Sequence, residues 1–239
     1  MGSPLAEGTL VKLLLDNGYH VYRVTLKGHC GPIEDMQNVT LDEWKNQAYL
    51  HYCAAKSLAD DEGLPLYFLG FSLGALIYEY LITAKTAEPV QFEKAILFSP
   101  AIALRPYTKL ILWVPPYGNK SIVKSASPKE YHSHIGTSMA AYKALFSLQK
   151  SFHYSTIGNC NVDTIIFIDK KDELISFRLL RKIIKKNHLT NWEIHEVSNK
   201  GTVVKPIFHH LLIDSKCVSP QTWQYISQTI ISFLSPGSL

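Results

Sequence analysis

The chain has 239 residues, 46% hydrophobic and 18% charged, with a formal net charge of +4 at pH 7. This length and composition allow one sizeable buried core, so we expect a single domain over residues 1–239. The sequence has no basic stripe interleaved with aromatic residues and no apolar run as long as a membrane span, which argues against a nucleic-acid partner and an integral membrane protein.

Helical and strand patterns alternate along most of the chain. In chain order they predict a helix over residues 5–17, a strand over 20–26, a helix over 41–60, a strand over 66–69, a helix over 73–86, strands over 94–98 and 164–168, a helix over 177–187, a strand over 192–197 and a helix over 220–234. The clearest helix start is at Thr40, because Thr40 and Glu43 form a capping-box pattern. Apolar strands that alternate with helices are typical of a parallel sheet covered on both faces. The predicted fold class is α/β, with a mostly parallel, doubly wound sheet.

Residues 101–160 interrupt this alternation. The segment is rich in Pro, Tyr, Ser and Lys, and near its start it contains the cluster LRPYTKLILWVPPYG. Long insertions in compact domains more often form lids or binding elements than idle loops, so we interpret this segment as a cap. The apolar residues of the cluster have two interpretations that the sequence leaves open: packing of the cap itself, or the wall of a pocket for an acyl chain.

The strongest chemical signal is the sequence Gly70-Phe71-Ser72-Leu73-Gly74, which lies between a predicted strand and a predicted helix. Its three fixed positions alone are a weak signal, but this setting is that of a nucleophile elbow. Such a turn is expected to lift Ser72 clear of the sheet. It is also expected to need glycine at positions 70 and 74, because a Cβ at either would collide with neighbouring backbone. Ser72 is the candidate nucleophile.

A serine nucleophile needs a histidine that takes its proton and a carboxylate that orients the histidine. Asp172 follows the predicted strand 164–168, at the edge where open parallel sheets place their sites. Asp169 lies nearer the strand end and competes for the role; we favour Asp172 because loops carry functional groups on such scaffolds. The alternative is that Asp172 and Glu173 form only an acidic start to the next helix.

The candidate bases are His209 and His210, the only histidines after the last predicted strand. Their position in the sequence does not show which of the two is the base. His132 and His134 form an H-x-H pattern in the cap, but no complete zinc set surrounds them, so we predict no metal site. The chemistry of such a triad needs no cofactor, and none is predicted.

On these residues the chain resembles the α/β-hydrolase superfamily, and within it the branch of monoacylglycerol lipases, lysophospholipases and small carboxylesterases. The resemblance covers nearly all of the chain. It rests on NGYHVYRVTLKGHCG at 17–31, Trp44, GFSLGA at 70–75, DELIS at 172–176, FHHLLID at 208–214 and the cap at 101–160.

The resemblance implies roles for individual residues. Ser72 corresponds to the nucleophile and Asp172 to the acid. The family's catalytic histidine is followed five positions later by an acidic residue, which selects His209 through Asp214, with His210 as the alternative. The backbone N–H of Leu73 corresponds to an oxyanion donor, at a helix N-terminus that also favours developing negative charge.

The chain departs from the family at its start. In the family, a strand ending in His-Gly precedes the helix that we expect over residues 5–17, and its loop supplies the other oxyanion donor. Gly2 and Gly8 occur here, but no apolar strand precedes them. We therefore expect a sheet shortened at its N-terminal end and a weakened oxyanion hole, since losing one such donor costs about 2.7–4 kcal/mol of transition-state stabilisation.

The expected function is that of a serine hydrolase that cleaves carboxylic esters through an acyl-enzyme on Ser72. The cap favours a small-molecule substrate with an apolar acyl chain. The alternatives are an aminopeptidase or thioesterase with the same triad, or a catalytically impaired hydrolase-like binding protein. An aminopeptidase would need carboxylates to receive an amine, and Glu130 is the only carboxylate within residues 101–160.

The cysteines and the N-terminus bear on the compartment. Cys30, Cys53, Cys160 and Cys217 lie far apart without zinc-type spacing, which is typical of free, buried thiols in a reducing compartment. The first ten residues, MGSPLAEGTL, lack the charged and apolar regions of a signal peptide. We expect a cytoplasmic protein, and the sequence makes no prediction of its oligomeric state.

Overall fold

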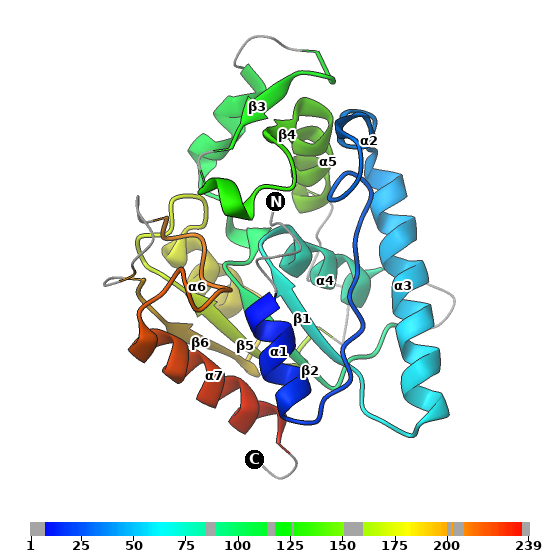
Figure 1. Cartoon of the computed structure of the whole chain (residues 1–239), viewed down its shortest axis with the longest axis vertical. Coiled ribbons are helices and arrows are strands. Elements are labelled where there is room, and N and C mark those ends of the chain that lie inside the picture. The colour runs from blue at the N-terminus through cyan, green and yellow to red at the C-terminus, as the bar shows by residue number, and fades with distance from the viewer. Residues whose placement is uncertain are drawn as a thin grey trace.

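The computed structural model describes residues 8–84, 89–113, 118–125, 127–150, 160–199, 202 and 208–235. Its main sheet has four parallel strands in the order β1-β2-β5-β6 (Figure 1). The strands are β1 (Tyr67–Phe71), β2 (Lys94–Phe98), β5 (Asp163–Ile168) and β6 (Trp192–Glu196). The strand β1, which leads into Ser72, is an edge strand of this sheet.

Helices cover both faces of the sheet. Side chains of β2 alternate between two cores: Ala95 and Leu97 face one, and Ile96 and Phe98 face the other. The first core includes residues of α2 (Ile33–Gln37), α3 (Leu41–Asp61), α4 (Leu73–Thr83) and α6 (Phe177–Lys186). The second includes residues of α1 (Gly8–Asp16) and α7 (Pro220–Leu234), which Figure 1 draws on one side of the sheet. This arrangement confirms the predicted α/β fold with a parallel, doubly wound sheet.

Most of the predicted helices and strands are present, with ends that differ by a few residues. The capping box at Thr40 is confirmed: its side chain accepts a hydrogen bond from the Glu43 N–H, and the Glu43 carboxylate accepts one from the Thr40 N–H. The helix that it starts ends at Asp61. Residues 5–7 and 85–86, which belong to two predicted helices, lie outside the described residues.

The predicted strand over residues 20–26 is wrong. Its β-branched and aromatic residues are not assigned to any strand, and side chains such as Tyr22 and Val24 are more than 40% exposed. A strand needs a neighbour that completes its backbone hydrogen bonds, and no described strand pairs with this segment. Its end is held instead by α3, where the Trp44 Nε1–H donates to the Lys27 carbonyl at 3.0 Å.

The segment between β2 and β5 contains an element that the sequence did not predict, a two-stranded antiparallel sheet. We call this segment the insert. Its described elements are η1 (Ala101–Ala103), η2 (Pro106–Trp113), β3 (Ile122–Lys124), η3 (Lys129–Tyr131), β4 (Gly136–Ser138) and α5 (Met139–Lys150), of which β3 and β4 form the small sheet. The Gln37 side chain at the end of α2 donates to the Lys120 carbonyl, which ties this insert to the main domain. In Figure 1, β3, β4 and α5 lie at the opposite end of the molecule from the C-terminus.

Two further observations concern membrane spans and the cysteines. Among the described residues, no helix combines the length and apolar character needed to span a bilayer. Cys160 and Cys217 are buried, as expected. Cys30 and Cys53 are exposed, so the expectation of buried thiols is wrong for these two residues.

Candidate active site

Ser72 stands in the turn between the edge strand β1 and the helix α4. Its backbone has φ of 50° and ψ of −108°, a left-handed conformation that is uncommon for a residue with a side chain. Two hydrogen bonds connect this turn to the chain at the end of β2: the Ser72 N–H donates to the Phe98 carbonyl at 2.9 Å, and the Ala101 N–H donates to the Ser72 carbonyl at 3.1 Å. The strained conformation is therefore fixed by the neighbouring strand, as in a nucleophile elbow.

The two glycines of the turn differ in what they are needed for. A Cβ on Gly70 would lie 2.8 Å from the backbone nitrogen of Ala75, so the prediction of a collision is confirmed there. A Cβ on Gly74 would meet no described atom within 4 Å, so the same prediction is wrong at that position. The reason is that Gly70 lies beneath the first turn of α4, whereas Gly74 faces open space on that turn.

Asp172 lies in the loop after β5 and is completely buried. Its Oδ1 accepts hydrogen bonds from the N–H groups of Leu174 and Ile175, each at 2.8 Å. Burial alone would raise the pKa of this carboxyl. The facing His210 and the two backbone donors outweigh that effect, so the pKa of Asp172 lies below its ordinary value. The residue is therefore a buried carboxylate that is kept ionised by its partners.

His210 connects Asp172 to Ser72. Its Nδ1 lies 2.9 Å from Asp172 Oδ2, and its Nε2 lies 3.0 Å from Ser72 Oγ. The ring packs against Phe71 and Phe208, with centroid distances of 5.0 and 6.1 Å. Because the Asp172 carboxylate can only accept, Nδ1 carries the proton and Nε2 is free to accept one from the serine. Three side chains from distant parts of the sequence thus form one hydrogen-bonded chain.

The structure corrects the choice between the two histidines. The family's spacing favours His209 as the base, but His209 Nδ1 lies 2.8 Å from Asp169 Oδ2. Asp169 is thus the partner of His209, while Asp172 is the partner of His210. Consecutive residues of a turn point their side chains in different directions, so only one of them can reach Ser72. The five-residue spacing to Asp214 therefore points to the histidine whose ring contacts Asp169 and not Ser72.

Asp214 belongs to the packing around the site. Its carboxylate accepts hydrogen bonds from the Thr9 and Tyr131 hydroxyls, each at 3.2 Å, and from the Lys216 N–H at 2.8 Å. These bonds join α1 and the insert to the loop that follows His210. Asp214 is 5% exposed, so this junction is buried.

Leu73 is the first residue of α4 and is 6% exposed. The first N–H groups of a helix have no carbonyl acceptor four residues before them, and the helix dipole favours negative charge there. The Leu73 N–H therefore has the position expected of an oxyanion donor. The family's preceding loop would correspond to residues before Gly8, which lie outside the described residues, so the predicted loss of the other donor stays a prediction.

The two histidines of the H-x-H pattern have partners in the protein. His132 Nε2 lies 2.7 Å from the Ser127 carbonyl, and His134 Nε2 lies 3.2 Å from the Gly28 carbonyl. Within the part of the chain that the structure describes, no group of three or more His, Cys, Asp or Glu side chains could hold a metal ion. The described residues thus offer no candidate metal centre beside the triad.

Sequence analysis missed the role of Glu173. Its two carboxylate oxygens accept the N–H groups of His209 and His210, each at 2.9 Å. A signal was present in the sequence, because an acidic residue directly after the candidate acid can face the same loop as that acid. The helix-start interpretation of Asp172 and Glu173 concealed it. The helix α6 has Ser176 as its N-cap instead.

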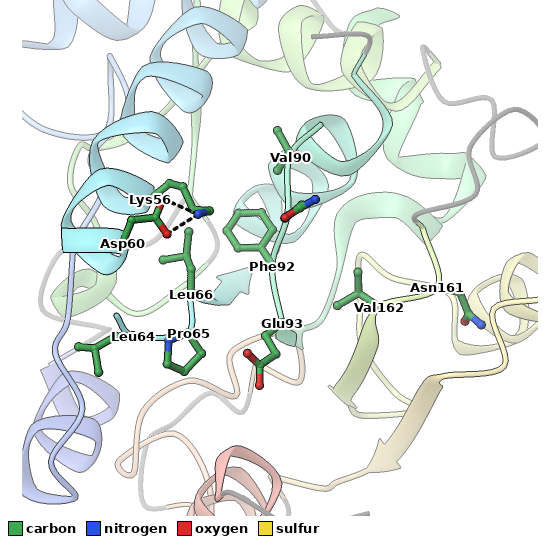
Figure 2. Close-up of a pocket in the computed structure, with 11 residues that line it drawn as sticks. Lys56, Asp60, Leu64, Pro65, Leu66, Val90, Phe92, Glu93, Asn161 and Val162 are labelled. Atoms are coloured by element: carbon green, nitrogen blue, oxygen red, sulfur yellow. Dashed lines mark hydrogen bonds and ion pairs between the residues drawn. The ribbon is translucent and has the colours of Figure 1, made fainter. Parts of the chain in front are cut away.

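One cavity in the described part of the structure lies away from Ser72. It has a volume of about 540 Å³. Figure 2 shows its walls, with the Lys56–Asp60 ion pair of α3 on one side and Phe92 and Val162 on the other. These walls come from residues that end α3 or precede β1, β2 and β5. The cavity therefore lies at the amino ends of the strands, whereas Ser72 and Asp172 follow the carboxyl ends.

Comparison with known protein families identifies the family to which the chain belongs. Residues 6–145 match the family described as serine aminopeptidase, S33. The chain belongs to this family of α/β hydrolases. The match includes the elbow at Ser72, so the resemblance inferred from the motifs is confirmed. We found no similar sequence among curated proteins.

Solved structures of other α/β hydrolases share the fold. One is reported under the description of two metagenome-derived lipolytic enzymes, LipS and LipT; it has 16% identity and a TM-score of 0.72, over 97% of this chain and 88% of that chain. A soluble variant of monoglyceride lipase from Saccharomyces cerevisiae has 14% identity and a TM-score of 0.71, over 95% and 81%. A monoacylglycerol lipase from Paleococcus ferrophilus has 15% identity and a TM-score of 0.58, over 97% and 91%.

Proposed function

We propose that this α/β hydrolase is a serine hydrolase that cleaves carboxylic esters, with Ser72 as nucleophile, His210 as general base and Asp172 as the acid. The observation that carries the proposal is the continuous hydrogen-bonded chain from Asp172 through His210 to Ser72 Oγ. Ser72 alone would be a poor nucleophile, because its hydroxyl keeps its proton at neutral pH. The imidazole at 3.0 Å supplies the acceptor for that proton.

The proposed reaction proceeds in two steps. Ser72 Oγ attacks the carbonyl carbon of the ester while His210 Nε2 takes the hydroxyl proton. The negative charge that develops on the carbonyl oxygen is stabilised by the Leu73 N–H, and Asp172 stabilises the imidazolium. His210 then protonates the departing alcohol, which leaves an acyl-enzyme. In the second step water attacks the acyl carbon while His210 takes its proton; the bond to Ser72 Oγ then breaks, His210 returns the proton to Ser72, and the carboxylic acid leaves.

The insert favours a substrate with an apolar acyl chain. Tyr107, Leu110 and Trp113 of η2 are 53%, 63% and 77% exposed, which is unusual for three large apolar side chains on one short element. The element is tied to the site: Arg105 Nε donates to the Asp172 carbonyl, and the Tyr107 hydroxyl donates to the Glu173 carbonyl. An acyl chain bound at Ser72 would thus have an apolar surface nearby. The lipases among the similar structures agree with this class.

An aminopeptidase is the second candidate, because the matching family is described by that activity. Such an enzyme needs a carboxylate that can receive the substrate's amine. Asp169, Asp172, Glu173 and Asp214 each accept at least two hydrogen bonds from the protein. The side chain of Glu130 lies outside the described residues. The carboxylates described around the triad are therefore engaged, which favours an ester substrate.

The proposal is tested first with a fluorophosphonate probe, which reacts covalently with activated serines. We expect labelling of the wild-type chain, and none of the Ser72→Ala variant. Absence of labelling in a wild-type chain that is folded by circular dichroism would reject the enzyme and favour a hydrolase-like binding protein. Hydrolysis of aminoacyl p-nitroanilides in preference to p-nitrophenyl esters would favour the aminopeptidase.

A further inference from the structure

The Glu173 carboxylate joins two loops: the acid loop after β5, which carries Asp172, and the histidine loop between β6 and α7, which carries His209 and His210. Glu173 Oε1 accepts the N–H of His209 and Oε2 accepts the N–H of His210, both at 2.9 Å. Two neighbouring amides on one carboxylate form a forked clamp, and each bond is strengthened because the acceptor is charged. The clamp thus links Glu173, the neighbour of Asp172, to the backbone of His210, whose ring lies against Ser72.

The loop that presents Glu173 is itself firmly held. Asp172 Oδ1 accepts the N–H groups of the two residues after Glu173, which closes a tight turn around it. The insert fixes the same loop from outside: the Arg105 N–H donates to the Leu174 carbonyl at 2.8 Å, and the Tyr107 hydroxyl donates to the Glu173 carbonyl. A rigid loop is needed for positioning, because a mobile carboxylate would follow the histidine instead of fixing it.

Other contacts hold neighbouring residues of the histidine loop. Asp169 pairs with the His209 ring, and the Asn199 side chain donates to the Phe208 carbonyl at 2.8 Å. Among these contacts, only that of Glu173 acts on the backbone of His210. The ring of His210 has its own contacts with Asp172 and Ser72, but a ring can reach both atoms only if its Cα is correctly placed.

We infer that Glu173 is a positioning residue, which fixes the His210 backbone so that the imidazole bridges Asp172 and Ser72. The inference rests on the proposed function, since it assigns Glu173 a role in the same triad. It gives Glu173 no contact with substrate. The side chain acts through His210, so its loss should slow the chemical step and leave substrate binding unchanged.

The test compares Glu173→Gln with Glu34→Gln, which removes an equal charge at an exposed position on α2. A glutamine side chain keeps the shape of Glu173 but offers one acceptor oxygen and places an NH₂ group against an N–H donor. We expect kcat for p-nitrophenyl butyrate to fall about 10- to 100-fold with KM unchanged, as for a misplaced catalytic group. Glu34→Gln should match the wild type. A kcat within twofold of the wild type, or a raised KM at unchanged kcat, would overturn the inference.

A second measurement does not depend on activity. We expect amide hydrogen exchange of residues 208–213 to become faster in Glu173→Gln and to stay unchanged in Glu34→Gln. Should Glu173→Gln fail to fold, Glu173→Asp keeps the charge but is too short to hold both N–H groups, and the same changes are expected. If the wild-type chain neither hydrolyses the ester nor reacts with the fluorophosphonate, the proposed function fails. Exchange then decides the clamp alone: faster exchange supports it and unchanged exchange rejects it.

Discussion

His210 Nε2 lies 3.0 Å from Ser72 Oγ, although 138 residues separate the two in the sequence. Each residue follows a different part of the sheet: Ser72 directly follows β1, and His210 lies in a loop between β6 and α7. The contact exists because the parallel sheet brings the carboxyl ends of its strands to one edge. The contact between the two side chains therefore exists only in the folded chain.

The first prediction separates the two neighbouring histidines. Because only His210 contacts Ser72, His210→Ala should lower kcat for p-nitrophenyl esters by about 10³-fold or more. His209→Ala removes only the contact with Asp169 and should cost less than about 10-fold. Steady-state kinetics of the two variants at equal folded concentration provide the measurement. Equal losses in both variants, or a larger loss in His209→Ala, would contradict the assignment.

The second prediction concerns the two glycines of the elbow. Gly70→Ala places a Cβ 2.8 Å from the Ala75 nitrogen, so backbone must move, at a cost of about 1–3 kcal/mol or more. Gly74→Ala meets no described atom within 4 Å, and Ala is the better helix former by about 1 kcal/mol. Urea denaturation should therefore show a loss of stability in the first variant and no loss in the second. Destabilisation by Gly74→Ala would show that the position is crowded.

The third prediction uses the ionisation of Asp172. Its pKa lies below the ordinary value because His210 and the backbone donors outweigh its burial, so it stays charged as the pH falls through the range where histidine titrates. Asp172 should therefore make no contribution to an acidic fall in kcat/KM. Asp172→Asn should lower kcat about 10³- to 10⁴-fold, because the amide no longer favours the required tautomer. Asp16→Asn, at the exposed end of α1, is the control; pH profiles of all three proteins are the measurement.

The fourth prediction concerns stability at acid pH. Burial lowers the pKa of His29 to about 4, against 6.5 for the free side chain. Below pH 6.5 the unfolded chain takes up a proton that the folded chain does not, so the free energy of unfolding falls as the pH drops from 6.5 towards 4. The loss from this group is on the order of 1–3 kcal/mol. Urea denaturation at pH 7.5, 6 and 5 should show a shallower loss in His29→Asn than in His20→Asn, whose histidine side chain is 76% exposed.

The fifth prediction concerns acyl-chain preference. Replacing both Leu110 and Trp113 by Ser removes apolar surface from η2 without touching the triad. We expect KM for p-nitrophenyl octanoate to rise about 10-fold while the acetate ester is unaffected, since longer chains gain more from apolar contact. Leu58→Ser, which removes an exposed leucine of α3, should change neither ester. A wild-type preference for acetate over octanoate would refute the proposed role of this element.

Most elements of the main sheet were predictable from the sequence because their signals are local. The capping box at Thr40 and the apolar run at β2 each specify an element without reference to the rest of the chain. Segment 20–26 has an equally strong strand pattern, but pairing depends on a neighbour that no local signal reveals. The sequence could not separate His209 from His210 for the same kind of reason: their rings contact Asp169 and Asp172, which lie in a loop distant in the sequence.

The insert was the least predictable part of the fold. Its short strands, β3 and β4, have three residues each, too few for an alternating pattern to stand out. Gly136 belongs there because a Cβ would lie 2.1 Å from the Val123 carbonyl oxygen. Such a close approach of two backbones leaves no trace in sequence beyond a single glycine. The hairpin is therefore visible only once the chain is folded.

The outermost position of β1 in its sheet has a consequence for heat resistance. In the described sheet β1 pairs with β2 alone, and strands at a sheet boundary open at lower free energy than those inside it. Fraying of this one strand relaxes the left-handed geometry at Ser72 while β2, β5 and β6 remain paired. On gradual warming, catalytic power should vanish several degrees before circular dichroism registers melting of the domain.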